Sequence, residues 1–159
     1  MRCSSAPLSS AKTGANFLNK ALAAYESGDY MKAIHILVPQ VENMMRELLG
    51  LIGGPKMKRA PNQPKFFEYK NMNDFFREPR IEEALDENLY LFLKTLYIDK
   101  RAYNLRNDLV HGLVDAAAFN EQIASLVLQS IILLSMPRPD QVFVPVQENA
   151  EDPEPGQSG

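Results

Sequence analysis

The stretch "LRNDLVHGLVD", residues 105 to 115, places an arginine, an asparagine and one of the chain's two histidines within six residues. The guanidinium of Arg106 can hold a phosphate or stabilise the charge of a pentavalent transition state. The imidazole of His111 can move a proton near neutral pH, and Asn107 can orient either partner or a substrate. Metal-free RNA cleavage requires this combination, because the 2′-hydroxyl of the RNA itself supplies the nucleophile.

A structural interpretation of the same residues stays open. Histidine followed by glycine is typical of a helix C-terminus, where an imidazolium favours the negative end of the dipole and Gly112 takes a left-handed cap. Arg106 and His111 are five residues apart, which on one helix places them roughly 140° around the axis from each other. We therefore expect them to flank a groove. Spacing alone does not decide between the two interpretations.

The elements that must position this motif are predicted to be helices. Apolar residues at helical spacing predict a first helix that ends near Ser27 and a long second helix that begins after Asp29 and ends at Gly53. Pro39 lies inside the second helix, where the missing hydrogen bond predicts a kink.

Further helical segments follow. Asn73 or Asp74 is predicted to cap a helix that Pro79 interrupts, and an apolar stripe over 85–97 forms the next helix. Residues 99–104 are predicted to be a turn or a continuation of that helix. Asp115 is predicted to cap a last helix that ends before Pro137. The fold class is then all-α, an up-and-down bundle of four to five helices.

Composition places limits on the class of protein. The formal net charge is -3, and the single cysteine can form no internal disulfide, which favours a reducing compartment. We expect a disordered N-terminus over 1–14, a helical domain over 15–136 and a Pro-rich, acidic, disordered tail over 137–159. Within that tail "QVFVPV" can be a short extended piece. The longest apolar stretch is shorter than the ~18 to 20 residues of a membrane span, so we expect a cytoplasmic chain without direct membrane insertion.

The segment 53–65, "GGPKMKRAPNQPK", is basic and rich in turn residues. It is interpreted as a mobile loop and solvated connector. The alternative is that Lys56, Lys58 and Arg59 contact an RNA backbone. No aromatic stacking platform of the kind used for single-strand binding is evident.

Two parts of the sequence resemble one known family. "RNDLVHG" matches the R-N-x-x-x-H-G signature of the HEPN superfamily (higher eukaryotes and prokaryotes nucleotide-binding). Residues 25–49, "YESGDYMKAIHILVPQVENMMRELL", are similar to the first half of that domain in the endoplasmic reticulum membrane-associated RNA degradation branch and its bacterial relatives. The resemblance implies a HEPN-like helical fold and a metal-independent ribonuclease that needs no cofactor. It also implies a position peripheral to the endoplasmic reticulum, through segments missing here or through a partner.

The resemblance further implies roles for single residues. Arg106 would stabilise the phosphate, His111 would be the general acid or base, and Asn107 is the polar residue that follows the arginine. A homodimer would bring both motifs to one composite cleft. Glu42 and Arg46, one turn apart on the second helix, are supporting candidates that pair with each other or reach toward Arg106.

Other residues of the second helix are interpreted structurally. His35 follows the family sequence, and we expect it on the same side of its helix as Ile34, Val38 and Val41, in a structural role. The structural interpretation of Glu42 and Arg46 is a surface salt bridge that contributes under ~1 kcal/mol to stability.

Two hypotheses from different classes result. The first is an endoribonuclease that cleaves single-stranded RNA, not DNA, by 2′-hydroxyl attack. The second is a catalytically inactive helical dimerisation or RNA-binding module, in which His111 is a cap and the last helix supplies the interface. The enzyme predicts that Arg106 and His111 share an open cleft across a dimer, whereas the module predicts a buried or cap-engaged His111.

Overall fold

The computed structural model describes residues 8–136 of the chain. Its elements follow in the order α1 (Leu8–Glu26), α2 (Tyr30–Leu51), β1 (Met57–Ala60), β2 (Gln63–Tyr69), α3 (Met72–Phe75), α4 (Pro79–Ala84), α5 (Glu87–Tyr97), α6 (Leu105–His111), a short 3-10 helix η1 (Ala116–Ala118) and α7 (Glu121–Ser135). The described part is mostly helical, as the sequence predicts, but it also contains a two-stranded antiparallel sheet.

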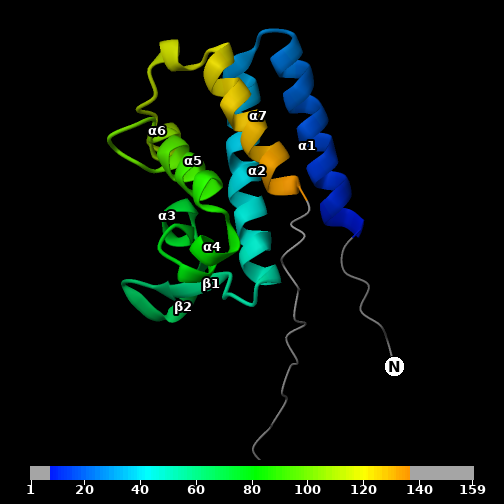
Figure 1. Ribbon diagram of the computed structural model, residues 1–159. Helices are drawn as coiled ribbons and strands as arrows, with labels where there is room; N and C mark the ends of the chain where they lie inside the picture. Colours follow the sequence, from blue (N-terminus) through cyan, green and yellow to red (C-terminus); the bar gives the residue numbers. More distant parts are fainter. Residues whose placement is uncertain (1–7, 137–159) are drawn as a thin grey trace, which may run out of the picture.

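Helix α2 is the centre of the molecule. It packs against α1 and α7 and also against α3 and α4, and Figure 1 shows it running through the middle of the view. Its buried face consists of most of the predicted apolar stripe together with one alanine: Ala33, Ile34, Leu37, Val38, Val41, Met45 and Leu49. Met44, Leu48 and Ile52 of the stripe are partly buried. Burial of such a stripe is the main source of helix stability in a globular protein.

The ends of α2 agree with the sequence prediction. The Asp29 side chain caps the helix by accepting a hydrogen bond from the Lys32 backbone N–H at 3.1 Å. Pro39 lies inside α2, and the helix continues through it to Leu51. The kink at Pro39 stays a prediction.

The segment expected to be a basic loop is largely a β-hairpin. Strands β1 and β2 pair antiparallel, with Met57 opposite Tyr69 and Arg59 opposite Phe67, and the register shifts after Arg59. The expectation of a loop over 53–65 was wrong because Gly53, Gly54 and Pro55 only precede β1, and Pro61 and Asn62 only form the turn between the strands. The second strand runs into the aromatic "FFEY" stretch, which favours strand. The hairpin lies beside α3 and α4 at one end of the molecule (Figure 1).

Two predicted helix caps were misplaced. Helix α3 is capped by Asn71, not by Asn73 or Asp74, because Asn71 and Asp74 form a reciprocal capping box that satisfies two backbone N–H groups. Asp115 caps only η1, and Asn120 caps the last helix α7 by accepting from the Ile123 N–H at 3.0 Å.

The chain between α5 and α6 forms a turn. Asp86 caps α5, and residues 99–104 reverse the chain before α6 begins. Asn104, at the start of α6, has φ 46°, in the left-handed region that asparagine tolerates better than most residues. Helix α6 is therefore separate from α5 rather than its continuation.

The helical region begins earlier than predicted and ends where predicted. Helix α1 begins at Leu8, earlier than the expected domain start at residue 15, and α7 ends at Ser135, before Pro137 as predicted. The predictions for the tail over 137–159, including the extended piece over 141–146, lie outside the described residues. Across 8–136, every helix is too short or too polar to cross a bilayer.

Candidate functional site

Arg106 is positioned by the packing of α6 and by a carboxylate on α2. The preceding residue Leu105 is buried in the core and fixes the start of α6. From there the Arg106 Nε–H donates to Glu42 Oε2 at 2.9 Å, with both side chains partly buried. The two terminal guanidinium nitrogens of Arg106 have no hydrogen-bond partner among the described residues. The ion pair thus fixes the guanidinium and leaves two cationic donors for another anion.

Glu42 also binds a second arginine. Its Oε1 accepts from Arg46 at 3.2 Å, and Arg46 donates further to the Lys70 carbonyl at 3.3 Å and to Asn43 Oδ1 at 3.3 Å. Both contacts expected of Glu42, with Arg46 and with Arg106, therefore occur together. One carboxylate between two guanidiniums in a partly buried setting is held more strongly than an exposed surface pair.

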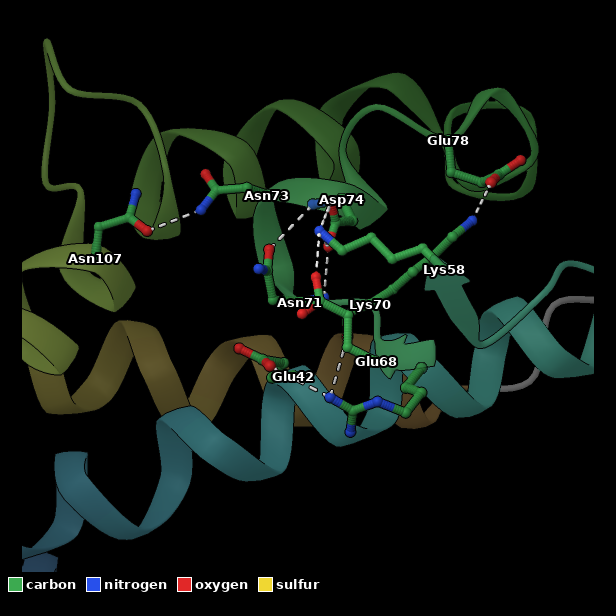
Figure 2. A network of polar contacts seen from close by, with 10 residues as sticks. Glu42, Lys58, Glu68, Lys70, Asn71, Asn73, Asp74, Glu78 and Asn107 are labelled. Carbon is green, nitrogen blue, oxygen red and sulfur yellow. Dashed lines mark hydrogen bonds and ion pairs between the residues drawn. The ribbon is translucent and has the colours of Figure 1, made fainter. Parts of the chain in front are cut away.

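Asn107 links α6 to α3. Its Oδ1 accepts from Asn73 Nδ2 at 2.9 Å, and its own Nδ2 donates to Asn104 Oδ1 at 2.8 Å. Figure 2 shows Asn73 and Asn107 facing each other from these two helices. Asn107 therefore fixes the position of α6 in the described structure, and its expected role toward a substrate stays a prediction.

His111 is the last residue of α6 and is exposed. Its side chain has no hydrogen-bond partner within the described part of the chain. Gly112 takes the left-handed C-cap at φ 67°, and its N–H bonds to the carbonyls of Asp108 and Leu109. The structural prediction for Gly112 is thus confirmed, while the imidazole stays open to solvent.

Two of the three cations proposed to contact RNA are already paired. Lys56 binds Glu47 at 2.8 Å, and Lys58 binds Asp74 at 2.9 Å and Glu68 at 3.3 Å. These carboxylates compete with any phosphate for the two lysines.

The carboxylate of Asp74 is the best-defined of these partners. Partial burial raises its pKa, but the hydrogen bond from the Asn71 backbone and the ammonium of Lys58 outweigh burial, so the pKa of Asp74 lies below its ordinary value. Asp74 is therefore charged at neutral pH, and Figure 2 shows Lys58 extended toward it.

Arg59 differs from the two lysines. It is exposed, it lies over the Phe67 ring at 5.9 Å, and none of the described acids pairs with it. Of the three predicted RNA contacts, Arg59 is the one whose charge is available.

The second histidine lies elsewhere. His35 Nδ1 is 2.7 Å from the Met31 carbonyl, and its ring stacks on Phe119 at 5.2 Å. These contacts join α2 to the segment before α7 and fit the structural role expected for His35, although the side chain is exposed rather than on the buried stripe.

Two hollows are lined by residues of α5 and α7. One of about 440 Å³ is lined mainly by α5 and α7, and one of about 590 Å³ by the start of α7. Neither hollow is lined by Arg106 or His111. Within residues 8–136, no cluster of three or more His, Cys, Asp or Glu side chains could hold a metal ion.

Three residues that position the site were not found from the sequence. Asn73 and the Lys70 carbonyl act through contacts between elements, for which the sequence carries no local signal. Asn104 had a recognisable signal, since an asparagine directly before a helix can adopt a left-handed conformation.

Comparison with protein-family models, curated proteins and solved structures gives no match to this chain. The functional interpretation therefore depends on the geometry of Arg106, His111 and their neighbours.

Proposed function

We propose that the protein is a metal-independent endoribonuclease that acts on single-stranded RNA. The observation that carries the proposal is the state of Arg106, whose guanidinium is oriented by Glu42 through Nε while its terminal nitrogens stay unpaired within the described residues. Five residues further along the same helix, His111 presents an exposed imidazole. The resemblance of "RNDLVHG" to the HEPN signature supports the same assignment.

The reaction uses the substrate's own nucleophile. The 2′-hydroxyl attacks the adjacent phosphorus, the bond to the 5′-oxygen breaks, and the products are a 2′,3′-cyclic phosphate and a 5′-hydroxyl. His111 accepts the proton of the 2′-hydroxyl or donates one to the leaving oxygen. Arg106 stabilises the negative charge on the phosphoryl oxygens in the transition state.

A dimer completes the proposed site. On one helix, Arg106 and His111 point roughly 140° apart and are displaced by about 7.5 Å along the axis. A second copy facing α6 would supply the missing half of each cleft. The exposed apolar side chains of Val110 and Leu113 beside His111 give this surface the character of an interface.

The test is cleavage of a labelled single-stranded RNA in excess EDTA. Replacing His111 by Ala is expected to lower the rate by roughly 10²- to 10⁴-fold, and Arg106→Ala by about 10²- to 10³-fold. The chain offers matched controls in His35→Ala and Arg101→Ala, which remove the other histidine and an exposed arginine paired only with Asp99. All variants are first shown to fold and to associate like the wild type.

The products and the controls decide the outcome. A cyclic phosphate end that disappears in both motif variants and persists in both controls supports the enzyme. Cleavage that survives His111→Ala, or that EDTA abolishes, contradicts it.

The second candidate is a catalytically inactive dimerisation or RNA-binding module. It is favoured by one observation, that His111 occupies the last turn of α6 where Gly112 forms the C-cap. A dimeric wild-type chain that binds RNA without cleaving it would support this candidate.

A further inference from the structure

One face of the β1–β2 hairpin carries exposed aromatic rings. Alternate residues of a strand share a face, so the cross-strand pairs Met57 with Tyr69 and Arg59 with Phe67 lie on the same face. These four residues are called the aromatic face below. Phe67 is 60% exposed and Tyr69 is 65% exposed. Large aromatic side chains are seldom left this exposed without a partner.

Each ring is accompanied by a guanidinium. The Arg59 guanidinium carbon lies 5.9 Å from the Phe67 centroid, and that of Arg46 lies 5.5 Å from the Tyr69 centroid. Such cation–π contacts restrict the rings while much of their surface stays open. Two residues along a strand, the rings are ~7 Å apart, so each can take a base of its own from an extended strand.

The charge around the aromatic face is positive. Residues 55–70 contain five lysines and arginines, of which Lys56, Lys58 and Lys70 are paired with Glu47, Asp74 and Glu78. Arg59 and the exposed Lys65 have no acidic partner among the described residues. The free charge on this hairpin is therefore complementary to a polyanion.

The aromatic face is joined to the candidate catalytic arginine through direct contacts. Tyr69 lies over Arg46, Arg46 binds Glu42 at 3.2 Å, and Glu42 binds Arg106 at 2.9 Å. A strand bound at the hairpin therefore lies within a few side chains of the guanidinium proposed to hold the scissile phosphate.

We propose that the aromatic face, which the sequence alone did not reveal, is a platform for single-stranded RNA, on which neighbouring bases stack on Phe67 and Tyr69 while Arg59 and Lys65 contact the phosphates. The choice of RNA as ligand rests on the function proposed above. Aromatic stacking with cationic backbone contacts is the general mode of single-strand recognition and needs no particular sequence. Paired bases in a duplex could not reach the rings, so the platform discriminates against double strands.

The experiment measures binding of fluorescently labelled oligouridine by anisotropy, in the full-length His111→Ala chain so that no cleavage occurs. Phe67→Ala is expected to weaken binding on the order of tenfold, and Tyr69→Ala similarly. Phe67→Tyr should retain affinity because the ring remains. Arg59→Ala should also lower the salt dependence of binding by about one phosphate contact.

The neighbouring aromatic residue supplies a matched control. Phe66 is 63% exposed but lies in the bulged part of β2, without a cross-strand partner in the register. Phe66→Ala is expected to change affinity less than twofold. Equal losses from Phe66→Ala and Phe67→Ala would overturn the proposal, because the effect would then not belong to the aromatic face.

Two other results would also overturn the platform. One is equal affinity for a duplex of the same length. The other is binding of the aromatic face to phosphatidylserine vesicles without binding to oligouridine. Because the assay requires no cleavage, an inactive wild type would leave a positive binding result intact, and cleavage unaffected by Phe67→Ala and Tyr69→Ala would overturn only the platform.

Discussion

Glu42 is the residue through which three parts of the molecule meet. It lies on α2, it fixes Arg106 of α6, and it holds Arg46, which contacts the hairpin through Tyr69. A single carboxylate balances two guanidiniums, so its removal would leave two partly buried cations close together. The free-energy cost of two unbalanced cations determines how strongly Glu42 holds Arg106 in position.

Glu42→Gln is expected to lower the free energy of unfolding by about 1–3 kcal/mol, because the neutral amide cannot balance both arginines. Glu47→Gln removes the exposed partner of Lys56 and should cost under ~1 kcal/mol. Urea denaturation of both variants checks the comparison. If the two variants lose the same stability, Glu42 does not hold the network in the way described.

The end of the short helix α6 depends on its C-cap. Gly112 has φ 67°, and a Cβ placed there would meet no atom within 4 Å. The penalty for another residue at this position is therefore backbone strain and not a clash. Since His111 immediately precedes this cap, the conformation of Gly112 also determines where the imidazole lies.

Gly112→Ala is expected to lower the melting temperature, because an alanine in the left-handed conformation is strained by about 1 kcal/mol. Gly14→Ala is the matched control, because Gly14 lies inside α1, has equally open space around it and needs no positive φ. It should stabilise the protein by about 0.5–1 kcal/mol. Calorimetry would support the cap if the two variants change stability in opposite directions. A Gly112→Ala variant with unchanged stability would contradict it.

The long elements could be predicted from the sequence, whereas the short ones could not. The apolar stripe of α2 and the Asp29 cap are local patterns, and both appear as expected. The hairpin was missed because Gly54, Pro55 and Pro61 indicate turns and hide the strands between them. The capping box of α3 was a readable signal, since Asn71 stands three residues before Asp74.

The residues of the candidate site could be predicted from the sequence, but the contacts between them could not. The sequence singled out Arg106, Glu42 and Arg46, and the structure brings them together. The bonds of Asn107 to Asn73 and of Arg46 to the Lys70 carbonyl depend on how α2, α3 and α6 pack. Such contacts join residues 34 and 24 positions apart, and no local periodicity encodes them.

At the scale of the whole molecule, the end of α6 is the surface on which association is expected. Leu113 is 72% exposed and lies two residues after His111. Val110 is 61% exposed, so two exposed apolar side chains flank His111 in the sequence. The proposed dimer would cover them and bring two α6 helices together.

Leu113→Glu is expected to convert the proposed dimer to a monomer and to abolish the proposed RNA cleavage, because a carboxylate buried in the interface would be unpaired. Sedimentation equilibrium measures the first effect and the RNA assay the second. Leu51→Glu, at a leucine that is 59% exposed at the end of α2, should leave both unchanged. A Leu113→Glu chain that remains dimeric and active would exclude this surface as the interface.

The hydrogen bond between Arg106 and Glu42 can form only late in synthesis of the chain, because it joins residues 64 positions apart. During translation α2 leaves the ribosome before α6, and Glu42 can already pair with Arg46 one turn away. Arg106 finds its carboxylate only after α6 has been synthesised and docked. A nascent chain therefore holds an incomplete candidate site until most of the helical region has emerged.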